Sequence, residues 1–214
     1  METVKGIAAG TSGVVLCLVS CAFAILPIVM TVYLGIYAFN NPDSEAWLGL
    51  SKSGKEEDFA LFKDEAAGKA AQATELVDVH GRFLVWFLWG FIAQLSPIAV
   101  VILTSIFTLC HPGFGSFCGG VLGCAQCCGT LAWWITGIVW RFRADGAYAA
   151  GDIIPEGTTI EDWEKKISAQ DSLFQYSSGK FMFFFYVISW SLCACSCTIS
   201  LIGALIGCCK AKDD

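Results

Sequence analysis

Long apolar runs alternate with two polar stretches along the chain. A helix that crosses a bilayer needs about 20 predominantly apolar residues, and four runs are long enough. None of these four runs contains Asp, Glu, Lys, Arg or His. The sequence therefore predicts an all-α integral membrane protein, a single four-helix bundle domain over residues 1–214. The predicted spans are 7–39, 83–109, 114–140 and 181–207.

An even number of spans puts both termini on one side of the membrane. The two polar loops, 41–81 and 142–179, then lie together on the other side. Spans two and three are joined only by His111-Pro112-Gly113, so we expect them to form a tight antiparallel hairpin.

Each polar loop carries a pattern typical of a short amphipathic helix. In the second loop, Thr158-Thr159 precede Glu161-Asp162, which indicates a capped helix start. The two loop helices either lie in the membrane interface or pack on each other as a cap. In the second loop the apolar stripe is Ile160, Trp163 and Ile167. In the first loop it follows Gly54-Lys55 and comprises Phe59, Phe62, Ala66, Ala70, Ala73 and Val77.

Residue size differs between the two ends of the spans. Aromatic residues gather at the loop end, whereas glycines four residues apart mark the terminus end. Small residues let helix backbones approach closely in lipid. We therefore expect a bundle that is tight at the terminus end and wide at the aromatic end; ordinary packing with an interfacial aromatic belt is the alternative. The expected helix-packing glycines are Gly6, Gly10, Gly119, Gly123, Gly203 and Gly207.

Composition narrows the function classes. The chain is 56% hydrophobic and 15% charged, with a net charge of −6, so it offers no basic face for a nucleic-acid partner. His80 and His111 are the only histidines, and both lie beside span ends. Ion-coupled transporters keep ionisable groups at mid-membrane, and these spans have none. Gln94 and Gln126 are the strongest polar groups inside, at depths where they could bond each other.

All twelve cysteines lie in the apolar runs or at their ends. This placement argues against the cysteine-bearing loops of claudins and tetraspanins. Two clusters, Cys124-x-x-Cys127-Cys128 and Cys193-x-Cys195-x-Cys197, raise the alternative of a metal site or iron–sulfur cluster. Residues two apart on a helix point about 200° apart, and buried thiols resist ionisation. We therefore expect no metal or cofactor, and we expect these cysteines to act as small packing residues.

Cys208 and Cys209 differ because they lie at a span boundary beside Lys210. They are candidates for palmitoylation if that face is cytosolic. The bases at the loop ends of the spans favour cytosolic loops. The frequent eukaryotic four-span layout favours cytosolic termini, and we adopt that orientation as the expectation.

The third span ends in Trp134-Ile-Thr-Gly137-Ile-Val-Trp140-Arg141, followed by Gly146 and Gly151-Asp152. Ser178-Gly179-Lys180-Phe181 then opens the fourth span. This arrangement resembles the small uncharacterised four-span proteins grouped as transmembrane-protein-272-like, of protist type. The likeness covers the last two spans and implies no activity or site residues. The layout is also similar to MARVEL-type tetraspans.

These patterns predict a non-enzymatic structural or scaffolding membrane protein that self-associates or packs with other membrane proteins. One alternative is an accessory membrane subunit of a large respiratory or photosynthetic complex. Another is a small oligomeric channel. The expected partners are the lipid bilayer and further copies of the chain or other membrane proteins.

Overall fold

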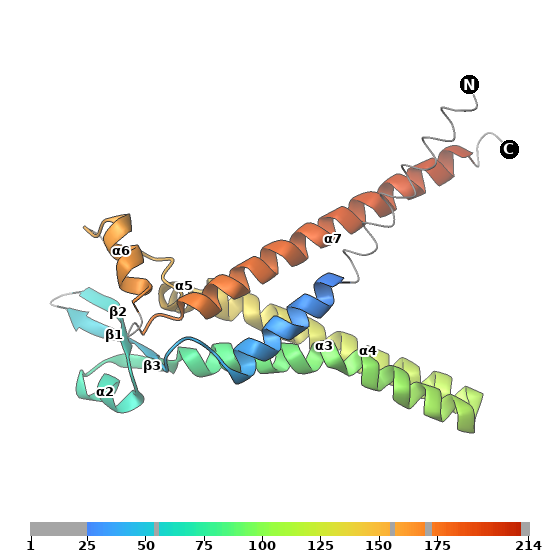
Figure 1. Ribbon diagram of the computed structural model, residues 1–214, viewed down its shortest axis with the longest axis horizontal. Helices are drawn as coiled ribbons and strands as arrows, with labels where there is room; N and C mark the ends of the chain where they lie inside the picture. Colours follow the sequence, from blue (N-terminus) through green and yellow to red (C-terminus); the bar gives the residue numbers. More distant parts are fainter. Residues whose placement is uncertain (1–24, 54–55, 155–156, 170–172, 211–214) are drawn as a thin grey trace.

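The computed structural model describes residues 25–210 except 54–55, 155–156 and 170–172; for 52–57 and 199–210 it describes the backbone alone. Long helices extend away from a small folded cap at one end (Figure 1). Both predicted loops form this cap, so they lie at the same end of the molecule. The long helices are Ile25–Phe39, α3 (Val79–Cys110), α4 (Pro112–Phe142) and α7 (Tyr176–Lys210).

Three helices are long and apolar enough to cross a membrane: α3, α4 and the stretch Tyr176–Thr198 of α7. Only 6% of the most apolar window of α3 is buried inside the chain. So large an apolar surface calls for a lipid environment or for other protein. The first predicted span is described only as Ile25–Phe39, and 7–24 lie outside the described residues. The four-span bundle is thus seen in part, as three helices of spanning length.

The predicted hairpin of spans two and three is present. α3 continues through Pro97 and ends at Cys110. Pro112 occupies the first turn of α4, where a missing N–H costs nothing. The His111 Nδ1 accepts a hydrogen bond from the Phe114 N–H at 3.2 Å and so caps α4. The short connection therefore sets α3 and α4 side by side in opposite directions.

The first loop folds mainly as an antiparallel sheet, so the purely α-helical class is wrong there. The amphipathic helix expected after Gly54-Lys55 is instead mostly strand. Phe59 and Leu61 pack on one side of β2, as a strand's period of two requires, against a core that includes Leu48. Over so short a run, helical and strand periods cannot be told apart. The elements are β1 (Trp47–Ser53), β2 (Glu56–Phe62), α2 (Glu65–Ala70) and β3 (Thr74–Asp78), in the sheet order β2-β1-β3.

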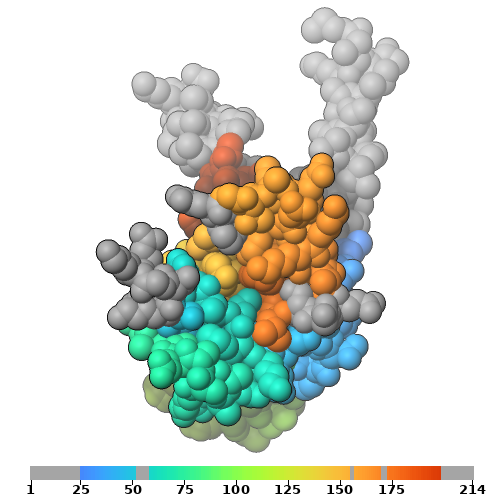
Figure 2. Space-filling view, turned by 90° about the vertical axis from the view of Figure 1, so that its left-hand side faces the viewer, coloured from blue at the N-terminus to red at the C-terminus, as the bar shows by residue number. Residues whose placement is uncertain are grey.

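The second loop contains α5 (Ala144–Ala149) and α6 (Ile160–Ile167). The predicted cap is present, because the Thr159 Oγ1 accepts a hydrogen bond from the Asp162 N–H. Trp163 is buried against Phe174, and its Nε1 donates to the Gly151 carbonyl at 2.7 Å. Of the stripe residues expected in this second loop, Ile160 is exposed, whereas Trp163 and Ile167 are buried. The sheet and α6 share the end face of the cap (Figure 2), so α6 packs as part of the cap.

The aromatic residues form the core of the helical part next to the cap. Trp86 of α3 and Trp133 of α4 stack with ring centroids 4.9 Å apart. Each indole donates to the other residue's carbonyl, at 3.3 Å from Trp86 and 2.8 Å from Trp133. Neither indole N–H is therefore left unpaired in the core. The same cluster includes Leu34, Phe83, Phe87, Met182, Phe185 and Tyr186.

The taper of the helices is opposite to the expected one. α4 and α7 lie together at the aromatic core and diverge away from the cap (Figure 1). The close approaches use Gly90, which faces Trp133, and Gly137, which faces Trp86 and Tyr186. Large rings therefore pack tightly where glycines on the facing helix make room for them. For α4 and α7 the expectation of a bundle that is tight at its glycine-rich end is therefore not met, whereas α3 and α4 stay in close contact as far as Gly115 and Gly119.

Replacing Gly137 by alanine should destabilise the helical core. The added Cβ would meet the Trp86 Nε1 and the Tyr186 hydroxyl. Overpacking of this kind costs about 1–3 kcal/mol, so the melting temperature in mild detergent should fall. Gly129→Ala is the matched control on α4, because its Cβ would have no described atom within 4 Å. Equal melting temperatures for the two variants would contradict the assigned close contact.

Candidate functional site at the junction of cap and helices

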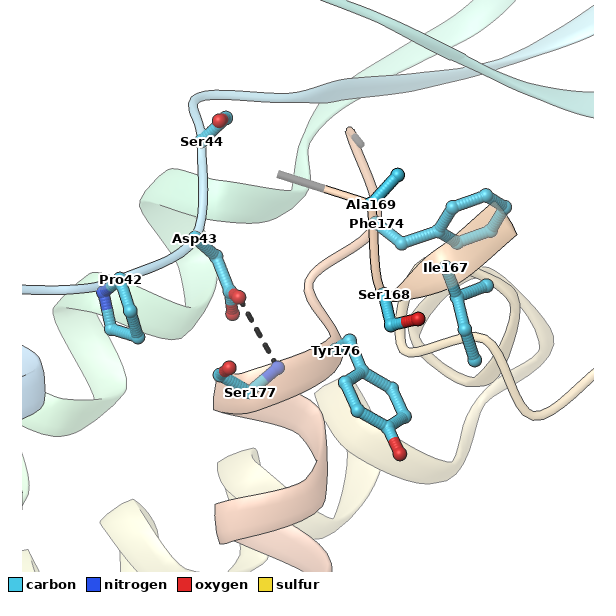
Figure 3. A pocket seen from close by; sticks show the side chains of 9 residues that line it. All are labelled: Pro42, Asp43, Ser44, Ile167, Ser168, Ala169, Phe174, Tyr176 and Ser177. Carbon is cyan, nitrogen blue, oxygen red and sulfur yellow. Dashed lines mark hydrogen bonds between the residues drawn. The ribbon is translucent and has the colours of Figure 1, made fainter. Parts of the chain in front are cut away.

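The segment that follows the first helix caps the start of α7. The Asp43 carboxylate accepts a hydrogen bond from the backbone N–H of Ser177 at 3.2 Å (Figure 3). It accepts a second one from the backbone N–H of Ser178 at 2.7 Å. A carboxylate at a helix start satisfies free N–H groups and meets the positive end of the helix dipole. The Asn41 Oδ1 also accepts from the Ser178 hydroxyl at 3.1 Å. The end of the first helix is thereby bound to the start of α7.

Gln175 is fully buried and joins three parts of the cap. Its Nε2 donates to the Ser44 carbonyl and its backbone N–H donates to the Ala149 carbonyl, both at 2.7 Å. Its Oε1 lies 2.9 Å from the His80 Nδ1. Because a carbonyl oxygen only accepts, the His80 Nδ1 carries the proton in this contact. His80 thus serves to hold Gln175 in place.

Three ion pairs lie at the junction, each with one buried partner. Asp145 is 8% exposed and lies between Arg82, at 3.1 Å, and Arg143, at 3.6 Å. Arg141 is 2% exposed; its Nε donates to the Gly179 carbonyl at 2.7 Å, and its Nη1 lies 2.7 Å from the Asp152 carboxylate. These contacts connect the cap-side ends of α3, α4 and α7.

A cavity of about 220 Å³ opens beside Asp43 (Figure 3). Both Asp43 oxygens are used by backbone N–H groups, and the Ser168 hydroxyl donates to the Glu164 carbonyl. The lining residues offer neither a histidine nor a thiol. The cavity wall is therefore built of groups that already hold the cap together. Its lining is Pro42, Asp43, Ser44, Ile167, Ser168, Ala169, Phe174, Tyr176 and Ser177.

A second cavity, of about 470 Å³, lies between β2 and α6. Phe59 and Tyr148 form part of its wall, with ring centroids 5.4 Å apart. Burial, with a smaller contribution from the negative charge of Asp58, raises the pKa of the Tyr148 phenol. The phenol therefore remains neutral at physiological pH, and this wall is apolar in character.

The cysteines with described side chains lie on the outer surfaces of α3, α4 and α7. The six residues of the two clusters, from Cys124 to Cys197, are all exposed. In the described part of the chain, no three His, Cys, Asp or Glu residues gather closely enough to hold a metal ion. Cys17 and Cys21 lie outside the described residues. Cys208 and Cys209, the expected lipidation sites, fall where α7 is described by its backbone alone.

The expected packing glycines fall in different surroundings. A Cβ at Gly119 would lie 2.9 Å from the Thr104 side chain of α3, whereas one at Gly123 would meet no described atom within 4 Å. Gly6 and Gly10 lie outside the described residues. Gly203 and Gly207 lie in the backbone-only part of α7. Within the described chain, Gly119 thus faces a neighbouring helix and Gly123 faces open space.

Gln126 forms the polar contact between α3 and α4, with partners other than the expected Gln94. Its Nε2 donates to the Ala93 carbonyl at 2.9 Å, and its Oε1 accepts from the Ser96 hydroxyl. Its Nε2 also donates to the Thr130 hydroxyl of α4 at 3.1 Å. The partners of Gln126 on α3 thus lie one and two positions from Gln94.

Sequence reasoning missed the residues that hold the junction. Gly90 and Gly137 were not singled out as close contacts, although each lies among aromatic residues, which is the available signal. Arg141 directly follows a span, and a cation so placed could have been assigned a partner in the facing loop. Asp43 and Gln175 gave no local signal, because their partners are remote in sequence.

Comparison with models of protein families gives no match, and neither curated proteins nor solved structures yield one. Fold and site therefore rest on the geometry described above.

Removing the Asp43 carboxylate should loosen the start of α7. Asp43→Ala leaves the Ser177 and Ser178 N–H groups without acceptors, and loss of a helix cap costs about 0.5–2 kcal/mol. The variant should melt earlier in detergent and exchange the amide hydrogens of Ser177 and Ser178 faster. Asp58→Ala, at an exposed carboxylate, is the control. Unchanged exchange at both serines would rule out this capping role.

Proposed function

We propose that this chain is a non-enzymatic structural membrane protein that self-associates within the bilayer and carries a folded cap on one face. The proposal includes four spans, with the apolar residues before Ile25 completing the first. One observation carries it: α4 keeps a small-residue face that nothing in the described chain covers.

This face is the stripe Ser116, Gly120, Gly123 and Cys127 of α4. A Cβ at Gly120 or Gly123 would meet no described atom within 4 Å. By helical spacing, the stripe continues the side of α4 that carries Trp134, whose ring stacks on that of Trp190 in α7 at 5.9 Å. Away from the cap α7 diverges from α4 (Figure 1), and Gly120 and Gly123 have no described neighbour there.

Open small-residue faces favour association in lipid. Close backbone contact gains van der Waals packing that lipid tails supply less well. A second copy of the chain can bring its own stripe to this face, because α4 is the same in each copy. Two α4 helices in contact would then form a symmetric interface, the commonest kind in homo-oligomers.

Gly123→Leu should therefore weaken self-association and leave the monomer folded. Its side chain would enter space that no described atom of the monomer occupies but that the proposed oligomer fills. At an overpacking cost of about 1–3 kcal/mol, association should weaken about fivefold to a hundredfold. Light scattering of purified protein in mild detergent measures this as a shift from oligomer to monomer.

Ala125→Leu, at an exposed position on another side of α4, is the matched control and should assemble like the wild type. A wild type that is monomeric throughout would refute self-association. Stoichiometric copurification of a different membrane protein would favour the accessory-subunit alternative.

We also propose that the termini face the cytosol and the cap lies on the opposite side. The frequent four-span layout supports this orientation. It predicts that protease added to sealed cells cuts the cap near Gly157, in the turn before α6, and spares a tag fused after Asp214. Cleavage of the tag with an intact cap would reverse the orientation.

A further inference from the structure

We propose that the junction between α4 and α7 binds one phospholipid of net negative charge from the leaflet next to the cap. The phosphate would lie at Lys180, above the buried Arg141. One acyl chain would follow the groove between α4 and α7. This site is independent of the self-association proposed above.

The headgroup end is a cavity of about 280 Å³ where the apolar helices meet the cap. Lys180 is exposed, and its Nζ donates to the Tyr176 hydroxyl at 2.7 Å. No described carboxylate pairs with Lys180. Its ammonium group, which also lies 4.7 Å from the centroid of the Tyr176 ring, is thus held at the membrane boundary without a described carboxylate partner, at the level of a lipid phosphate.

Arg141 adds positive charge beneath Lys180. Its Nη1 lies 2.7 Å from the Asp152 carboxylate, but within the described chain this buried nitrogen donates no hydrogen bond. Lys180, Arg141 and Asp152 line the same cavity, so two cations there face one carboxylate. An anionic headgroup complements this balance, whereas the cation of a choline headgroup would lie beside two like charges.

The groove that continues from this cavity fits an acyl chain. It measures about 420 Å³ and lies on α4 and α7 within their apolar stretches. The rings of Phe142, in the groove wall, and Phe183, in the cavity wall, lie 6.3 Å apart, so the two spaces adjoin. The groove lining is Ile138, Phe142, Tyr186, Val187, Trp190 and Ser191.

The distance from Lys180 to the inner end of the groove supports the same occupant. At 1.5 Å per residue, the stretch of α7 from Lys180 to Trp190 spans about 15 Å. The hydrocarbon core of a bilayer is about 30 Å thick, so this stretch matches one leaflet. Trp190 is 60% exposed and lies at the inner end, where it can flank an acyl chain.

Native mass spectrometry of the full chain from nanodiscs tests the proposal. With equal phosphatidylglycerol and phosphatidylcholine, we expect one phosphatidylglycerol retained per protomer. Lys180→Gln should weaken its retention about fivefold, since one basic residue at a membrane surface contributes about 1 kcal/mol. Lys180→Arg should restore retention. Lys165→Gln, which removes an equal charge at an exposed position of α6 outside the cavity, should have no effect.

Substitutions in the groove test the binding of the acyl chain. Trp190→Ala should weaken retention, whereas Trp89→Ala, at an exposed tryptophan of α3 outside the groove, should not. Excess glycerol phosphate should fail to displace the lipid, because it lacks the acyl chain. Equal retention of both lipids, equal loss in Lys180→Gln and Lys165→Gln, or displacement by glycerol phosphate would each overturn the proposal.

Discussion

The reciprocal contact between Trp86 and Trp133 is the interaction on which the rest of the structure depends. Each indole fills the space above a glycine or a facing ring, and each donates to the other's backbone carbonyl. An indole N–H has no water to pair with in an apolar core, so these two bonds fix the relative height of α3 and α4. With the register of α3 and α4 set in this way, Phe185 and Tyr186 of α7 pack against the same rings.

The cap is held on this core by polar contacts that come mostly from helix ends. Helix ends carry backbone groups without partners inside the helix, and here side chains from other segments satisfy them. Asp43 does so for the start of α7. The Arg141 side chain adds a hydrogen bond to the Gly179 carbonyl in the first turn of α7. The contact between cap and helices therefore combines an apolar ring cluster with a rim of charge-assisted hydrogen bonds, which are stronger than neutral ones.

Sequence alone predicted the three helices of spanning length, because length and the absence of charge define a span without any tertiary information. It also predicted the hairpin and the Thr159 cap, which are local features. It failed in the first loop, where Phe59 and Phe62 fit a helical period but the partner strand decides the structure. The sequence also could not show that Gly137 makes a close helix contact whereas Gly123 does not. Spacing identifies a helix face, yet which neighbour lies opposite depends on how α7 crosses α4. The contacts of Asp43 and Gln175 were likewise inaccessible, since nothing local marks their partners.

The contacts of the segment 41–44 also set the order in which the chain can fold during synthesis. Ser44 and Gln175 are 131 positions apart, and Asp43 and Ser178 are 135 apart. At 5–20 residues per second, about 7–27 seconds separate the synthesis of these partners. The sheet is synthesised early, but segment 41–44 cannot make its native contacts until the start of α7 has been synthesised. Until then the nascent chain presents Asp43 and the backbone of Ser44 without their native partners, a state in which a chaperone can engage it.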